Sequence, residues 1–216
     1  MDIKEAIEKR RSARNYNNKN ISWELLDEIL DAGRYAPSAG NIQTWKVIIV
    51  TGAKDKQKIA LCCLNQEWIN KASVALILCS NLSILKKHYE KEAERYSRLN
   101  IGAVAQNIML RATSLGISNC WVDTFESKSL RRHFKIPEEI IPEVIITLGF
   151  SDEKLEVPRK VELEKLVYYG KWDNTLRDEK VLPIIIREAK AKVSEAIDKA
   201  KKENFKEKIK RVFRKK

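Results

Sequence analysis

Near the start of this 216-residue chain, a cluster of cations surrounds one hydroxyl group. Arg10, Arg11 and Arg14 flank Ser12 in the segment RRSAR, and Lys9 precedes them. Guanidinium groups bind phosphate oxygens through paired hydrogen bonds, and a hydroxyl can serve a further oxygen lone pair. The cluster is therefore a candidate phosphate site, although a targeting signal, a nucleic-acid patch or a solvated helix end has the same composition.

The sequence lacks the two common motifs that bind phosphate through backbone groups. No G-x-G-x-x-G follows a predicted strand, and no G-x-x-x-x-G-K-[ST] occurs. Phosphate binding would therefore depend on side chains, with Arg10, Ser12 and Arg14 as first choices. Because cations at a helix end also complement the helix dipole, we expect at least one of the three arginines to have a structural role.

The surrounding pattern predicts helices and strands in an α+β order. Asp2 and Ser22 are predicted helix caps, and Gly116 is the predicted end of a buried apolar helix. Strands are predicted at 45–51, 73–80 and 143–150, and further helices at 55–64, 82–96, 102–116 and from Ser127. The charged segment 82–96 suits an exposed cover.

The net charge of +12 belongs mostly to the end of the chain. Residues 184–216 hold thirteen Lys and Arg against five Asp and Glu, and their apolar residues recur at helical spacing. We expect a helix that docks on the protein's own surface, with nucleic-acid or anionic-membrane binding as the alternative.

The remaining composition predicts a cytoplasmic protein without a metal site. No apolar run approaches the ~20 residues of a membrane span, and the N-terminal residues lack the apolar core of a signal peptide. The four cysteines show no C-x-x-C spacing and read as buried thiols, with only two histidines to join them.

Four segments occur together in the order and spacing typical of one family. RRSAR at 10–14, APSAGNIQTW at 36–45, AQNIMLRATSLGISNCW at 105–121 and ITLGF at 146–150 resemble the nitroreductase family of FMN-dependent oxidoreductases. The resemblance covers residues 1–172, the predicted FMN-binding domain, and leaves 173–216 as a basic, amphipathic helical extension. It implies an α+β, nitroreductase-like fold with a central, mainly antiparallel sheet flanked by helices, in a homodimer with FMN at the subunit interface.

The resemblance also implies which residues bind FMN. The phosphate would be held by Arg10, Arg11, Ser12 and Arg14, and the flavin ring would lie against Pro37, Ser38, Ala39 and Asn41, with Gln43 close by, from the partner subunit. Arg159 and Lys160 resemble a basic segment that returns to the phosphate in this family, although an exposed basic turn would look the same.

Two segments depart from the family pattern. Thr44 stands where the family usually has proline, which affects the stiffness of the loop. Val122 and Asp123 follow Trp121 where the family usually has glycine in a loop that reaches the flavin ring. We expect both residues to contact the ring, and a carboxylate directed at it would oppose the anionic reduced flavin.

The implied activity is hydride transfer from NAD(P)H through flavin N5 to a small oxidised acceptor of the nitroaromatic, quinone or enone type. No catalytic side chain is predicted. The segment 82–100, with Tyr89, is expected to determine the choice of acceptor. The alternatives are a flavin-binding or interaction protein with little turnover, or a family variant that performs dehalogenation or flavin fragmentation.

Overall fold

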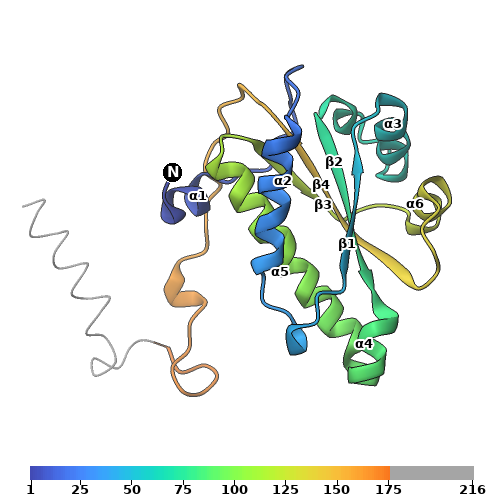
Figure 1. Ribbon diagram of the computed structural model, residues 1–216. Helices are drawn as coiled ribbons and strands as arrows, with labels where there is room; N and C mark the ends of the chain where they lie inside the picture. Colours follow the sequence, from blue (N-terminus) through green and yellow to red (C-terminus); the bar gives the residue numbers. More distant parts are fainter. Residues whose placement is uncertain (176–216) are drawn as a thin grey trace, which may run out of the picture. The chain divides into compact units, whose positions relative to one another are not determined.

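A computed structural model describes residues 1–175 of the chain (Figure 1). Residues 1–157 form one compact unit, and residues from Pro158 onward belong to a second unit. The predicted tail helix of residues 184–216 lies outside the described residues. No helix within residues 1–175 combines the length and the apolar character that crossing a membrane requires.

The first unit is built on a four-stranded sheet in the order β1-β2-β4-β3, in which all neighbours are antiparallel. The strands are β1 (Trp45–Val50), β2 (Val74–Asn81), β3 (Ser118–Val122) and β4 (Ile140–Gly149). β2 and β4 are central, and β1 and β3 form the two edges. The prediction of an α+β fold with an antiparallel sheet is confirmed.

Helices cover both faces of this sheet (Figure 1). The helices of the described residues are α1 (Ile3–Lys9), α2 (Trp23–Asp31), α3 (Ala53–Cys62), α4 (Leu82–Tyr89), α5 (Ala93–Ser114) and α6 (Ser127–Phe134). Short 3-10 helices lie at Ala32–Tyr35, Ala39–Asn41, Glu67–Lys71 and Glu90–Glu92. α2 and α5 pack on one face, and α3 and α6 pack on the other.

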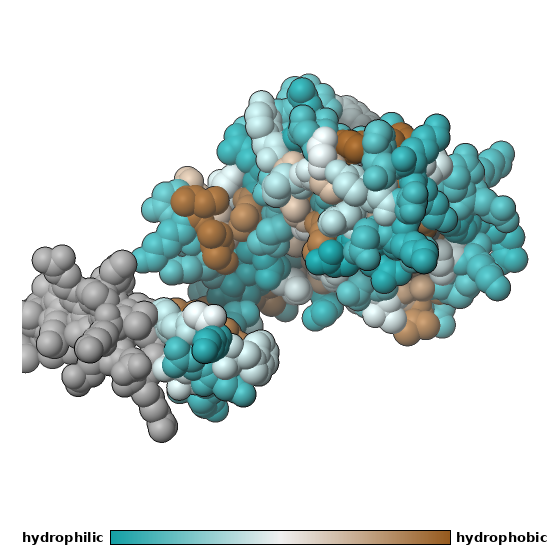
Figure 2. Space-filling model, turned by 90° about the horizontal axis from the view of Figure 1, so that it is seen from below, coloured by the Kyte–Doolittle hydropathy of each residue, from teal (hydrophilic) through white to brown (hydrophobic). Residues whose placement is uncertain are grey.

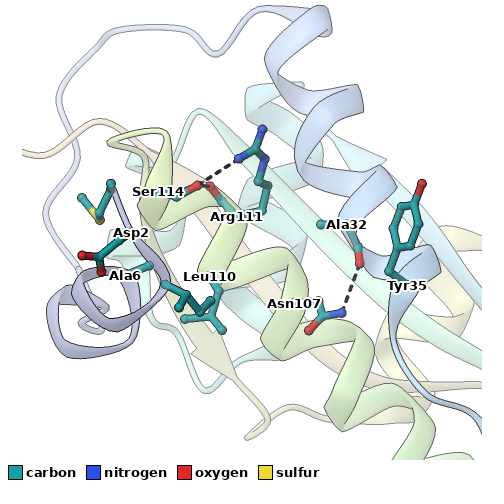
Figure 3. Close-up of a pocket in the computed structure, with 10 residues that line it drawn as sticks. Asp2, Ala6, Ala32, Tyr35, Asn107, Leu110, Arg111 and Ser114 are labelled. Carbon is teal, nitrogen blue, oxygen red and sulfur yellow. Dashed lines mark hydrogen bonds between the residues drawn. The ribbon is translucent and has the colours of Figure 1, made fainter.

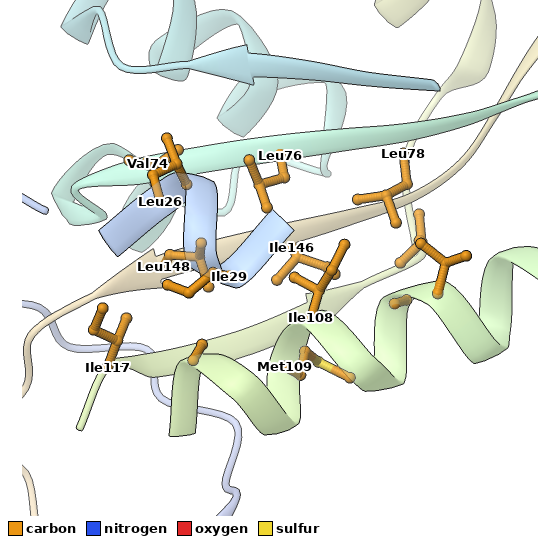
Figure 4. Packing of buried hydrophobic residues seen from close by; sticks show 14 of the residues in the cluster. Leu26, Ile29, Val74, Leu76, Leu78, Ile108, Met109, Ile117, Ile146 and Leu148 are labelled. Atoms are coloured by element: carbon orange, nitrogen blue, oxygen red, sulfur yellow. The ribbon is translucent and has the colours of Figure 1, made fainter. Parts of the chain in front are cut away.

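Each face of the sheet has its own core, because successive side chains of a strand point to opposite faces. Leu76, Leu78 and Ile146 face α2 and α5, where they meet Ile108 and Leu26 (Figure 4). Ala75, Ile77 and Ile145 face α3 and α6 in a second cluster. Burial on both faces explains why the segment VALILC is apolar throughout.

The predicted caps are present, but two predicted helix boundaries are wrong, namely the end of the helix at 82–96 and the start of the helix at 102–116. The Asp2 and Ser22 side chains accept hydrogen bonds from the backbone N–H groups of Glu5 and Leu25. The predicted helix at 82–96 instead breaks at Glu90, which has φ 41°, and the next helix, α5, then runs from Ala93 to Ser114. The sequence does not mark this break, because the residues on both sides of it are helical and similarly charged.

The described cysteines are free and buried, as predicted: Cys62, Cys63, Cys79 and Cys120. Over residues 1–175, no group of three or more His, Cys, Asp or Glu side chains could hold a metal ion. Burial raises the pKa of the Cys63 and Cys79 thiols to about 12, which keeps both thiols protonated at neutral pH.

Candidate functional site

The RRSAR segment lies along the outer edge of β3. Ser12 forms an isolated parallel bridge with Asn119, and the Ala13 N–H donates to the Asn119 carbonyl at 3.0 Å. Further along, the Asn17 N–H donates to the Phe150 carbonyl at 2.8 Å. The segment is thus held by backbone hydrogen bonds to strands from the other end of the domain.

Because this segment is extended, its side chains alternate between two sides. Arg10, Ser12 and Arg14 lie beside Cys120, whose thiol pKa is raised by burial and lowered in part by these neighbours. Arg11 lies on the other side, in a cleft of about 520 Å³ that Lys154 and Asn119 also line. The structure therefore places three of the four predicted phosphate-binding side chains on one side of the segment and Arg11 on the other.

The three grouped side chains have the chemistry that a phosphate needs. Within residues 1–175, neither Arg10 nor Arg14 forms an ion pair with a carboxylate. The Arg14 guanidinium lies over the Trp68 ring, 5.8 Å from its centroid, which fixes one end of the cluster. Two guanidinium groups and a hydroxyl without a counter-ion fit a phosphate monoester.

The second group of predicted residues forms a tight turn before β1. Gly40 and Asn41 both have φ 57°, in the left-handed region. The Gln43 side-chain amide donates to the Asn41 carbonyl and to the Asn41 side-chain oxygen, the latter at 2.9 Å. Pro37, Asn41 and Gln43 are exposed, whereas Ser38 and Ala39 are half-buried. The exposed amides leave one surface of the turn open to a ligand.

The turn and the arginine cluster lie at opposite corners of the sheet. The turn leads into Trp45 of β1, which pairs with Ser80 of β2. Ser12 lies beside Asn119 of β3. Asn119 pairs with Leu148 of β4, and Leu148 pairs with Val74 at the other end of β2. Four strand spacings lie between β1 and the RRSAR segment, so strand geometry separates the two groups by about 19 Å across the strands and about 20 Å along them. These two groups within one chain do not surround one common site.

Val122 and Asp123, at the end of β3, differ in exposure. The Val122 side chain is buried in the core beneath α3 and α6, so only its backbone groups face outward. The Asp123 carboxylate is exposed and accepts hydrogen bonds from the Trp121 indole at 3.3 Å and from the Thr124 hydroxyl at 3.4 Å. Both residues share the β3 edge with the arginine cluster.

Arg159 and Lys160 belong to the second unit and are exposed. In that unit, Leu163–Lys165 forms a 3-10 turn, and the Tyr168 and Trp172 rings lie 4.8 Å apart. The prediction that Arg159 and Lys160 return to the phosphate stays a prediction.

A cleft of about 390 Å³ lies between α1, α5 and the turn after α2 (Figure 3). Ile3, Ala6, Tyr35 and Leu110 line it, and the Asn107 amide donates to the Ala32 carbonyl at 3.2 Å at its rim. Ile3 is 68% exposed and Tyr35 is 78% exposed. On the face shown in Figure 2, hydrophobic residues form separate patches among hydrophilic residues.

Comparison with known proteins identifies the family. The family model described as "Nitroreductase family" matches residues 7–64 and 54–150. The chain belongs to the nitroreductase family. A putative NADH dehydrogenase/NAD(P)H nitroreductase of Methanothermobacter thermautotrophicus is 33% identical over 174 residues, which cover 76% of this chain and 88% of the relative. A protein of the same description from Archaeoglobus fulgidus is 33% identical over 150 residues, covering 67% of this chain and 83% of the relative.

Solved structures support the nitroreductase fold. A putative NADH dehydrogenase/NAD(P)H nitroreductase from Bacteroides thetaiotaomicron matches with a TM-score of 0.69 and 26% identity, covering 79% of this chain and 98% of the other. An NADPH:FMN oxidoreductase from Vibrio harveyi, complexed with NAD+, matches with a TM-score of 0.73 and 21% identity, over 79% of this chain and 77% of the other. The predicted family and fold are confirmed, and the predicted NAD(P)H-dependent oxidoreductase agrees with the names of these relatives.

Two residues beside the turn, Asn100 and Tyr89, are not among the predicted cofactor-binding residues. Asn100 of α5 accepts a hydrogen bond from the Ala39 N–H at 3.0 Å. Tyr89 of α4 was expected only to influence acceptor choice, yet its hydroxyl lies against Gly40. Asn100 is 6% exposed, and a buried amide on an apolar helix face was the signal that could have marked it.

Proposed function

We propose that this nitroreductase-family protein is an FMN-dependent oxidoreductase that takes electrons from NAD(P)H and reduces a small oxidised acceptor. The observation that carries the proposal is the group of Arg10, Ser12 and Arg14 at the β3 edge, with no carboxylate paired to either arginine among the described residues. Its donors match a phosphate monoester in charge and hydrogen-bonding capacity.

We further propose that two copies of the chain build each site. The arginine cluster and the turn lie at opposite corners of one sheet, so a ligand that touches both must take them from different subunits. The half-exposed face of α5, which includes Ala103 and Leu110, and the cleft beside α1 with the exposed Ile3 offer apolar surface for this contact. The same geometry supports the proposed homodimer.

In this arrangement the chain's own residues bind and orient the cofactor. Arg10, Ser12 and Arg14 hold the phosphate, and the amides of Asn41 and Gln43 face the polar edge of the ring from the partner subunit. The backbone of Val122 and the carboxylate of Asp123 lie along the same β3 edge as the arginines. When bound, FMN supplies two-electron transfer between the nicotinamide donor and the acceptor.

No side chain is assigned as a catalytic acid or base. The Asp123 carboxylate, just after β3, already accepts two hydrogen bonds from its neighbours. Protons can come from water, so the residues' contribution is binding, orientation and control of the local charge.

The test is to purify the protein, saturate it with FMN and record its visible spectrum before and after anaerobic addition of NADH or NADPH. We expect a bound flavin whose visible band bleaches with at least one donor. A flavin that binds and never bleaches would favour a binding protein without turnover. Failure to bind FMN at all would refute the proposal.

A further inference from the structure

The turn at Ala39–Asn41 places two consecutive residues in the left-handed region of the backbone. Gly40 and the following Asn41 both have φ 57°, and two consecutive left-handed residues are uncommon. Glycine and asparagine are the residues that most readily adopt this conformation, so the sequence permits the turn, and its position depends on the contacts around it. The contacts around the turn show what holds it.

The first contact comes from α5. The Asn100 side-chain oxygen accepts a hydrogen bond from the Ala39 N–H at 3.0 Å, across 61 residues of sequence. Because the oxygen faces Ala39, the amide nitrogen faces away, and it is buried without a hydrogen-bond partner among the described residues. A buried unpartnered donor is unfavourable, so this asparagine is kept at a cost to stability.

The second contact comes from α4. A Cβ built on Gly40 would lie 2.5 Å from the Tyr89 hydroxyl oxygen, closer than real Cβ atoms approach another atom. The Tyr89 ring is itself fixed edge-on against Tyr96, with 4.8 Å between the ring centroids. Ile42, directly after the turn, packs with Tyr89 against the cluster that includes Leu85.

We infer that Asn100 and Tyr89 are positioning residues that clamp the Ala39–Asn41 turn in the conformation that receives the flavin ring. The inference rests on the proposed function, because it assigns the turn to the ring. Asn100 fixes the start of the turn through a hydrogen bond, and Tyr89 limits the movement of Gly40 by contact. Neither residue needs to touch the ring itself.

The decisive variants are Asn100→Leu and Asn100→Asp. Leucine keeps the approximate size and removes the acceptor for the Ala39 N–H. Aspartate keeps an acceptor oxygen for the Ala39 N–H, so it tests rescue by the shared atom. We expect Asn100→Leu to weaken FMN binding about tenfold and to alter the visible spectrum of the bound flavin, and Asn100→Asp to stay within about threefold of the original chain.

Ser97→Ala provides the matched control on the same helix. Ser97 is also buried, and its hydroxyl donates to Glu143 at 3.4 Å and not to the turn. We expect Ser97→Ala to lower the melting temperature without changing the flavin spectrum. If Asn100→Leu and Ser97→Ala lower the melting temperature alike and neither changes FMN affinity or spectrum, Asn100 is a structural residue only and the inference is wrong.

A second readout separates this inference from the proposed function. Amide hydrogen exchange of Ala39 in the FMN-free protein should accelerate in Asn100→Leu and remain slow in Asn100→Asp, whatever the flavin does. If the original chain binds no FMN, the proposed function fails, and the assignment of the turn to the ring fails with it. If Ala39 exchanges equally in all the variants, the clamp itself fails.

Tyr89→Phe and Tyr89→Ala test the second contact. Removing only the hydroxyl should weaken FMN binding about twofold, and removing the ring should weaken it about fivefold, because Gly40 then gains room to move. Equal FMN affinity and equal exchange at Gly40 in both variants would remove Tyr89 from the clamp.

Discussion

The RRSAR segment and the Ala39–Asn41 turn are fastened to the same fold in different ways. The first is held by backbone groups: Ala13 and Asn17 donate to carbonyls of Asn119 and Phe150, at a sheet edge. The second is held by side chains, with Asn100 bonded to Ala39 and Tyr89 packed on Gly40.

This difference determines which substitutions each region can tolerate. A segment fixed through its backbone keeps its course when a side chain changes, so its side chains are available for binding. A turn fixed by side chains depends on residues about fifty to sixty positions away in the sequence. Substitutions in the first region should therefore affect binding directly, and substitutions in the second should affect it through geometry.

The largest effect should come from removing charge at the backbone-fastened segment. The double variant Arg10→Ala/Arg14→Ala loses two charge-assisted phosphate contacts, which should cost about 3–6 kcal/mol of FMN binding. That cost corresponds to a dissociation constant raised roughly 10²- to 10⁴-fold, measured by flavin fluorescence quenching. Arg11→Ala is the matched control, because Arg11 lies on the opposite side of the segment from Arg10 and Arg14. Full FMN occupancy in the double variant would show that the cluster does not bind the phosphate.

The next effect should come from disturbing how that segment is fastened. Gly149→Ala would place a Cβ 2.6 Å from the Tyr16 ring, which packs over β4. Overpacking of this kind costs about 1–3 kcal/mol of unfolding free energy. Chemical denaturation measures it, and Gly102→Ala on α5, where a Cβ meets nothing within 4 Å, is the control. Equal stability of the two variants would show that the segment can move away from β4.

A smaller effect is expected at the side-chain-fastened turn. Asn41→Ala removes one hydrogen-bonding amide beside the ring and one acceptor for Gln43, at a cost of about 0.5–1.5 kcal/mol. FMN affinity should fall roughly two- to tenfold with no change in the oligomeric state, as judged by light scattering. Unchanged affinity together with unchanged reduction kinetics would exclude Asn41 from the site.

The smallest effect should be electrostatic and have a required sign. Asp123→Asn removes the carboxylate charge and keeps the oxygen that the Trp121 indole N–H contacts. If the carboxylate lies beside the reduced anionic flavin, the midpoint potential should rise, by about 20 mV for each kcal/mol of repulsion relieved. Spectroelectrochemical titration measures it. Asp152→Asn, in the loop after β4, provides the charge-matched control. A midpoint potential that falls or does not change in Asp123→Asn would show that Asp123 is not beside the ring.

Much of the fold could be predicted because its signals are local. Capping by Asp2 and Ser22, the apolar run of β2 and the helix end at Gly116 each follow from neighbouring residues. The break at Glu90 could not be predicted, because helical residues lie on both sides of it and only the φ of one residue marks it.

The candidate site could be predicted only in part, for a similar reason. The residue types in RRSAR indicate phosphate chemistry, and the alternation of an extended chain then separates Arg11 from the other three. That separation depends on the segment pairing with β3, more than a hundred residues later. The role of Asn100 depends on a contact with a turn on another element, which periodicity does not reveal.

The fastening of the N-terminal segment also bears on how the chain reaches its folded state. Tyr16 forms a hydrogen bond with the Thr147 hydroxyl of β4 at 2.7 Å, and Ala13 donates to Asn119 of β3. Both partners are synthesised more than a hundred residues after the N-terminal segment. Contacts between residues so far apart in the sequence form late and slow folding, because the intervening chain must first lose conformational entropy. During synthesis the arginine cluster is among the first parts of the protein to emerge, and it gains its binding geometry only after nearly the whole domain has been made.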